Sequence, residues 1–147
     1  INANNLLFTV RGIPVLYQGS EVGFMRGTAE HAGNRNYFGQ ARIDAAAANP
    51  IHEALTRIAR LRATTPALQR GLQVNLLFEG DRAAFYRILE HDGVAQTALV
   101  LLNKGDTAAR FRFTDKVQPG RWREALGGTT RRVAAGAAFE AEVPANG

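Results

Sequence analysis

Cysteine is absent from this sequence. Its absence excludes disulfides, thiol nucleophiles and thiolate metal sites together. Histidine occurs only three times, and His31, His52 and His91 do not have the spacing of paired metal ligands, so we expect neither a metal nor another cofactor. No apolar run approaches the roughly 18 residues of a membrane-spanning helix, and we therefore predict no membrane partner.

Lysine is also scarce, since Lys104 and Lys116 are the only lysines among 18 basic residues and the rest are arginines. A nucleic-acid-binding surface would gather these arginines on one face between aromatic residues. Here they are spread along the chain, with Arg131 and Arg132 as the one adjacent pair. We interpret them as a solvated surface and predict no nucleic-acid partner. With 46% hydrophobic and 21% charged residues, the composition is typical of a folded segment with a packed core.

The first half of the sequence follows an α/β rhythm. Residues 2–11 carry apolar side chains at helical spacing, and Gly12 can adopt the left-handed backbone found just past a helix end. Residues 13–17 form a short apolar run, which predicts a strand buried on both faces of a parallel sheet. The glycine-rich stretch from Gly19 to about Asn49 predicts a long loop.

A second helix follows this loop. Asn49 and Pro50 are suited to be its N-cap and its first residue, and apolar residues recur at steps of three and four until the helix ends before Pro66. Its polar side carries three arginines, which we interpret as a solvated face that complements the helix dipole. These are Arg57, Arg60 and Arg62.

The second half of the sequence changes to short segments of strand character separated by turn signals such as Gly80-Asp81 and Asp92-Gly93. The regular spacing predicts an antiparallel sandwich. The predicted strands cover about 72–79, 82–89, 94–103, 108–113, 121–126, 129–134 and 138–143.

One segment carries a specific motif. Residues 11–21, Arg-Gly-Ile-Pro-Val-Leu-Tyr-Gln-Gly-Ser-Glu, fill all five fixed positions of the pattern G-x-P-x-x-Y-x-G-x-E. In this the segment resembles the eighth barrel strand of the family 13 glycoside hydrolases, which include α-amylases and cyclodextrin glucanotransferases. Residues 61–71, with Thr-Pro-Ala-Leu at 65–68, are similar to the end of that family's last barrel helix and the entry into its antiparallel domain C.

The resemblance implies an α+β fold in two parts. Residues 1–68 would be the C-terminal end of a (β/α)8 barrel, with its last strand and helix, and residues 69–147 an antiparallel Greek-key β-sandwich, domain C. Residues 144–147 look like a turn before one more strand, so we expect the sandwich to lack its final strand. Because the sequence opens on Ile1, we expect it to belong to a longer chain whose earlier part completes the barrel.

The resemblance also implies a function. The parent chain would act on starch or maltooligosaccharides, cleaving α-1,4 bonds by a retaining double displacement. That chemistry needs two carboxyl groups, which the family carries on earlier barrel strands, so we assign no catalytic residue to this segment. The resemblance does not decide the cellular location of the parent chain, although it slightly favours a secreted or periplasmic enzyme.

The predicted substrate-binding residues are Glu30, Asn34 and Arg35. They fall in a glycine-rich loop similar to the one in cyclodextrin glucanotransferases, where an acidic residue and an Asn-Arg pair contact sugars on the donor side. Arginine and carboxylate groups suit sugar hydroxyls because each can form two hydrogen bonds in a fixed geometry. Gln18 stands where the cyclodextrin-forming enzymes usually carry a second tyrosine, so hydrolysis, cyclisation and transfer all stay open.

Some single residues have two interpretations. Glu21 is expected to anchor the next loop by accepting backbone hydrogen bonds rather than to act in catalysis. Tyr37 and Phe38 could stack against a sugar or form a packing cluster that anchors the loop. Trp122 could mark a secondary carbohydrate site, although burial in the sandwich core is the stronger expectation.

A second hypothesis of a different class is a free-standing β-sandwich module that binds carbohydrate or protein without catalysis. The strand pattern at 13–17 favours the enzyme segment over this module. A single strand of the parallel type has no neighbours in such a module to satisfy its backbone groups.

Overall fold

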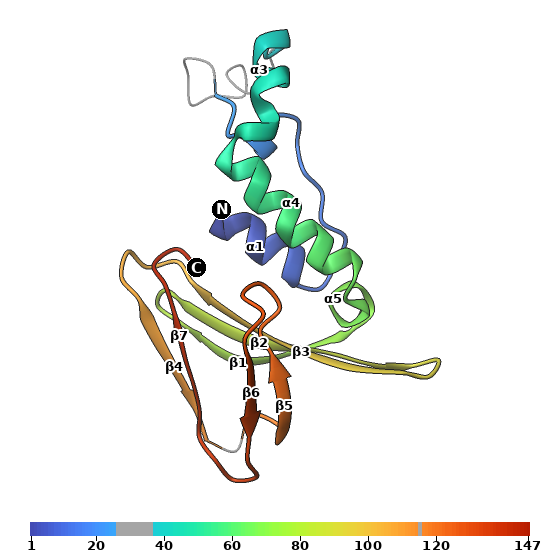
Figure 1. The fold of residues 1–147 in the computed structure, drawn as a ribbon, viewed down its shortest axis with the longest axis vertical. Coiled ribbons are helices and arrows are strands. Elements are labelled where there is room, and N and C mark those ends of the chain that lie inside the picture. The colour runs from blue at the N-terminus through green and yellow to red at the C-terminus, as the bar shows by residue number, and fades with distance from the viewer. Residues whose placement is uncertain (26–36, 115) are drawn as a thin grey trace.

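A computed structural model describes residues 1–25, 37–114 and 116–147 of this chain. It shows a helical part followed along the chain by a strand part (Figure 1). The α-helices are α1 (Asn2–Thr9), α3 (Gln40–Ala45), α4 (Pro50–Ala63) and α5 (Pro66–Arg70), and the 3-10 turns are η1 (Ser20–Val22) and η2 (Ala46–Ala48).

Helix α4 is confirmed with the predicted start. The side chain of Asn49 accepts a hydrogen bond from the backbone N–H of Ile51 at 2.9 Å, and proline follows the cap at the first helical position. The apolar side of the helix packs on α1, where Leu55 and Ile58 contact Phe8. The apolar spacing of the sequence therefore does bring these two helices together.

Two predictions for the region between α1 and α4 are wrong. Residues 13–17 are not a strand and are not buried, because Ile13 is 89% exposed and Val15 is 76% exposed. A strand needs a neighbouring strand for its backbone hydrogen bonds, and no described residue pairs with this segment. The long loop expected up to Asn49 also contains η1, α3 and η2, since its alanine-rich end has a high helix propensity.

The strand part confirms the antiparallel pattern. A three-stranded sheet has the order β1-β2-β3, and two separate ribbons pair β4 with β7 and β5 with β6. The strands are β1 (Leu72–Glu79), β2 (Arg82–His91), β3 (Val94–Asn103), β4 (Ala109–Phe113), β5 (Gly120–Arg123), β6 (Thr130–Val133) and β7 (Phe139–Val143).

The main apolar core lies between this sheet and the two ribbons. Its buried members come from both sides, and they are Ala84, Phe111, Phe113, Val117, Val133 and Phe139. Trp122 packs against this core, with its ring 6.3 Å from that of Tyr86, and its indole N–H donates to the carbonyl of Gln118 at 2.9 Å. Trp122 is only partly buried and packs against the core rather than within it, so the expected burial is confirmed in part.

A fully buried arginine joins the helical part to the strand part. Arg87 on β2 has no exposed surface, and its guanidinium donates to the carbonyls of Thr9 at 2.6 Å and Gly71 at 2.9 Å. Burial lowers the pKa of Arg87, and the positive charges of Arg62 and Arg11 lower it further. The Arg87 guanidinium thus lies at the C-terminus of α1, where the helix dipole favours a positive charge and the last carbonyls need donors.

Arg62 corrects the expected solvated face of α4. Its side chain is buried and donates to the carbonyls of Phe8 at 2.9 Å and Gly12 at 2.6 Å, and burial lowers its pKa. Arg57 and Arg60 are exposed as predicted. Arg62 differs because α4 packs alongside α1, which places the carbonyls at the end of α1 within its reach.

A second connection between the two parts lies at the end of β3. Asn103 is 1% exposed, and its amide donates to the carbonyls of Thr107 at 2.7 Å and Pro144 at 3.0 Å. From α1, the amide of Asn2 donates to the backbone carbonyl of Asn103 at 2.6 Å. Hydrogen bonds therefore hold both ends of α1 against the strand part.

Candidate functional site

The predicted substrate-binding residues Glu30, Asn34 and Arg35, together with His31, lie outside the described residues. The structure describes the chain on both sides of this loop, up to Met25 and again from Tyr37. The described part of the site consists of the two ends of this loop and the residues that contact them.

An aromatic cluster holds these two ends together. The rings of Phe24 and Phe38 lie 5.2 Å apart between centroids, and Phe24 is buried. Arg42 of α3 places its guanidinium carbon 5.5 Å from the centre of the Phe24 ring and donates to the carbonyl of Phe38 at 3.1 Å. For Phe38 the packing interpretation is confirmed. Tyr37 is 68% exposed and stays a candidate for stacking against a sugar.

The turn before this cluster depends on glycine. Gly19 has a φ of 91°, and its carbonyl accepts the N–H of Phe24 at 2.8 Å. A Cβ atom at position 19 would stand 2.9 Å from the Cβ of Phe24, closer than side chains approach one another. The glycine of the motif therefore lets the backbone turn back and seat Phe24 at the start of the loop.

A hollow of about 300 Å³ lies beside the cluster, between η1 and the segment that carries α3 and η2. Arg42 is its charged residue, and Asn49 closes one side, where its amide donates to the carbonyl of Val22 at 3.2 Å. A guanidinium and apolar walls are the groups that bind sugar hydroxyls and sugar faces. The lining consists of Val22, Gly23, Phe24, Met25, Arg42, Ala45, Ala46 and Asn49.

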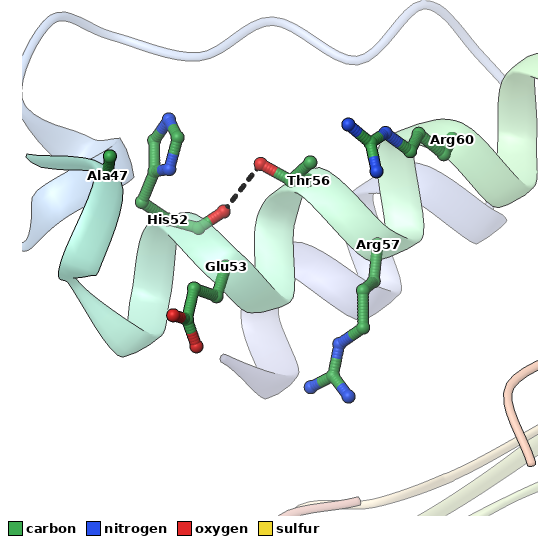
Figure 2. Close-up of a pocket in the computed structure, with 6 residues that line it drawn as sticks. All are labelled: Ala47, His52, Glu53, Thr56, Arg57 and Arg60. Atoms are coloured by element: carbon green, nitrogen blue, oxygen red, sulfur yellow. Dashed lines mark hydrogen bonds between the residues drawn. The ribbon is translucent and has the colours of Figure 1, made fainter.

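A second hollow, of about 450 Å³, follows the outer face of α4 (Figure 2). His52, Thr56 and Arg60 occupy successive turns of the helix, and the Thr56 hydroxyl donates to the carbonyl of His52 at 2.8 Å. Glu53 and Arg57 line it as well, so it is an open, charged surface. Its lining, as far as the described residues show, comes from η2 and α4.

Glu21 lies in η1, next to the first hollow. The hydrogen bonds found in the described part of the chain include none accepted by its carboxylate, so the anchoring role expected for it is not seen there. In residues 1–25, 37–114 and 116–147, no group of three or more His, Asp or Glu side chains is placed to hold a metal ion. No helix in that same part of the chain is long and apolar enough to cross a membrane.

Comparison with known proteins gives matches at the level of structure. No family model matches the sequence, and neither does any curated protein. The α-amylase of Geobacillus thermoleovorans, solved with acarbose, matches 99% of this chain with a TM-score of 0.80 and 23% identity. An Anoxybacillus α-amylase matches 97% of it with a TM-score of 0.75 and 23% identity. The chain has the fold of the C-terminal part of the α-amylases.

The match is to a part of larger proteins. This chain spans 30% of the Geobacillus α-amylase and 29% of the Anoxybacillus one. CldA, described as a cyclomaltodextrin glucanotransferase with three domains, gives a TM-score of 0.65 at 23% identity, over 96% of this chain and 29% of its own. The resemblance to the α-amylases found in the sequence is confirmed at the level of the fold, over nearly the whole chain.

Sequence reasoning missed three residues that shape the site. Phe24 and Arg42 close the base of the loop, and Arg87 fixes the end of α1 that leads toward it. For Arg87 a signal was present, because a charged residue stands inside the apolar run Ala83–Leu89 of a predicted strand. Such a residue is buried only with partners, so it marks a specific contact.

Proposed function

We propose that this chain is the C-terminal segment of an α-glucan-active glycoside hydrolase or transglycosylase of family 13. In this proposal the parent enzyme acts on α-1,4 bonds of starch or maltooligosaccharides by a retaining double displacement. Residues 1–68 contribute the end of the catalytic barrel, and residues 69–147 form domain C with a Greek-key order of strands. The single observation that carries the proposal is the α-amylase fold over 97–99% of the chain.

The exposed segment 13–17 supports this division of the chain. Ile13, Val15 and Tyr17 are 89%, 76% and 53% exposed, although all three are apolar or aromatic. An extended apolar segment without a paired neighbour in the described residues suits a barrel strand whose neighbours belong to the rest of the barrel. In a free-standing binding module, the apolar side chains of this segment would stay exposed to solvent with no partner to bury them.

The catalytic carboxyl groups are expected outside this segment. We expect the isolated 147-residue chain to release no reducing sugar from soluble starch, because retaining hydrolysis needs a carboxylate nucleophile and a carboxylic acid about 5 Å apart. The complete enzyme, assayed in parallel, should act on the same starch. Its products distinguish hydrolysis, cyclisation and transfer. Sugar release by the isolated chain, or a complete enzyme without action on starch, would overturn the proposal.

Arg35 is proposed to bind substrate together with Glu30 and Asn34. In the complete enzyme, Arg35→Ala should lower kcat/KM on a long maltooligosaccharide roughly ten- to a hundredfold, the equivalent of the 1.5–3 kcal/mol of a charged hydrogen bond. The melting temperature should hardly change, since an exposed ion pair contributes only about 0–1 kcal/mol.

The exposed Arg57 of α4 provides a matched control for this measurement. Arg57→Ala removes the same charge from the outer face of the helix and should leave kcat/KM within twofold of the parent. A binding role for Arg35 is refuted if Arg35→Ala behaves like Arg57→Ala. If the melting temperature falls strongly instead, Arg35 has a structural role.

A further inference from the structure

The two β-ribbons carry outward arginines in different electrostatic settings. On the β4–β7 ribbon, Arg110 stands opposite Glu142 and Arg112 opposite Glu140. The nitrogen-to-oxygen distances are 3.4 Å and 3.3 Å, so each arginine has a carboxylate on the partner strand. Opposite charges at facing positions of a sheet are favourable, and this ribbon neutralises its arginines internally.

On the β5–β6 ribbon, two of the facing positions on the outward side carry charges of the same sign. Arg121 stands directly opposite Arg132, and Arg123 follows two residues later on the same face, opposite Thr130. All three arginines are exposed. The ion pairs formed within the described ranges, 1–25, 37–114 and 116–147, include none of the three. Like charges that face each other across a ribbon are unfavourable, so a bound anion would relieve this arrangement.

The neighbouring charged residues of this ribbon are engaged elsewhere. Arg131 alternates to the opposite face, where its guanidinium carbon lies 4.1 Å from the centre of the Phe139 ring. Glu124 follows the end of β5, and its carboxylate occupies the space beside Gly127, 2.9 Å from where a Cβ atom at that position would stand. The charged side chains on the outward face of the ribbon are therefore those of Arg121, Arg123 and Arg132, beside Thr130.

The spacing of these three residues suits one oxyanion. Facing residues of an antiparallel pair have Cβ atoms about 5 Å apart, and residues two apart on a strand are separated by about 7 Å. Arginine side chains are long enough to converge over such distances. Guanidinium groups bind phosphate through pairs of parallel hydrogen bonds, and a phosphate monoester carries about −1.5 to −2 charges at pH 7.

We propose that Arg121, Arg123 and Arg132 form a docking surface for phosphate groups esterified to an α-glucan. This inference rests on the proposed function, which supplies the glucan. The sugar hydroxyls of an α-glucan are neutral, so ester-bound phosphate is the feature of such a polymer that a cluster of three cations recognises. An open, fully solvated ribbon binds a single small anion weakly, whereas three guanidinium groups can contact neighbouring phosphates of one polymer at the same time.

The test compares binding of this chain to phosphorylated starch and to the same starch after phosphatase treatment. The variant Arg121→Gln, Arg123→Gln, Arg132→Gln should lose at least tenfold in affinity for the phosphorylated form. The control variant Arg57→Gln, Arg110→Gln, Arg112→Gln removes the same number of charges from other exposed positions and should stay within twofold of the parent. The affinity of the parent chain should also fall as the salt concentration rises.

Circular dichroism of both variants establishes that they are folded. The docking surface is refuted if the parent chain binds both starches equally or binds neither, or if the two variants lose affinity equally. It is also refuted if inorganic phosphate competes at the same phosphate concentration as the phosphorylated starch, or if polyglutamate binds as tightly. Failure of the proposed function shows separately, as a complete enzyme without action on dephosphorylated starch.

Discussion

The Arg87→Met variant of this chain is expected to lose about 2–4 kcal/mol in the free energy of unfolding. Arg87 is fully buried and supplies the hydrogen bonds to the carbonyls of Thr9 and Gly71 at 2.6 Å and 2.9 Å. Methionine has a similar length and fills the space, but it leaves two buried acceptors without donors. The removal of a buried cation that has no carboxylate partner among the described residues offsets part of this loss.

The half-buried Arg82 provides the matched control on the same strand. Its guanidinium pairs with Glu79 at 3.3 Å at the surface, where an ion pair contributes about 0–1 kcal/mol, so Arg82→Met should cost less than 1 kcal/mol. Urea denaturation followed by circular dichroism measures both variants. Equal losses for Arg87→Met and Arg82→Met would show that the buried contacts do not hold the two parts together.

The Phe111→Ala variant is expected to lose about 3–5 kcal/mol, because the substitution removes a large buried side chain and leaves a cavity. Phe111 is 1% exposed and belongs to the core between the three-stranded sheet and the ribbons. Its ring lies 6.4 Å from that of Phe113, so the cavity would open inside an aromatic cluster. Such a loss is a large share of the 5–15 kcal/mol by which domains are stable.

Phe78 on β1 is the control for this second substitution. Its side chain is 56% exposed, although it stacks on Phe85 at 6.2 Å, and Phe78→Ala should cost about 1 kcal/mol. Both variants are compared with the parent by thermal and urea denaturation. A loss at Phe111 no larger than the loss at Phe78 would mean that the core does not depend on the packing between the sheet and β4.

Much of the secondary structure follows from local patterns in the sequence. The predicted strands at 72–79 and 94–103 have the observed bounds, because alternating or continuous apolar residues end at glycine-containing turns. Helix α4 begins at the predicted proline because its cap, Asn49, lies beside it in the sequence. The motif at 11–21 likewise indicated the α-amylase fold from contiguous residues.

The predictions that failed at residues 13–17 and at Arg62 depended on distant partners. The apolar run 13–17 has the composition of a buried strand, but pairing requires other strands, and none of the described residues supplies one. Phe24 contacts Phe38 and Arg42 across the two ends of a loop. No local pattern in the sequence predicts that these two ends lie close together. The positions of Glu30, Asn34 and Arg35 relative to that cluster stay a prediction.

By itself, the sequence determined helices α1 and α4, the antiparallel strands after residue 70 and the family pattern, because these properties arise from neighbouring residues. The tertiary structure alone decided the environments of the arginines. Arg62 and Arg87 are buried because they reach the carbonyls of Gly12 and Thr9, 50 and 78 residues earlier in the chain. Arg57 and Arg110 have the same side chain and stay in water, since no backbone acceptor within residues 1–25, 37–114 and 116–147 meets them there. An arginine is buried only where packing brings hydrogen-bond acceptors to its guanidinium. The composition of the chain does not predict which arginines meet such acceptors.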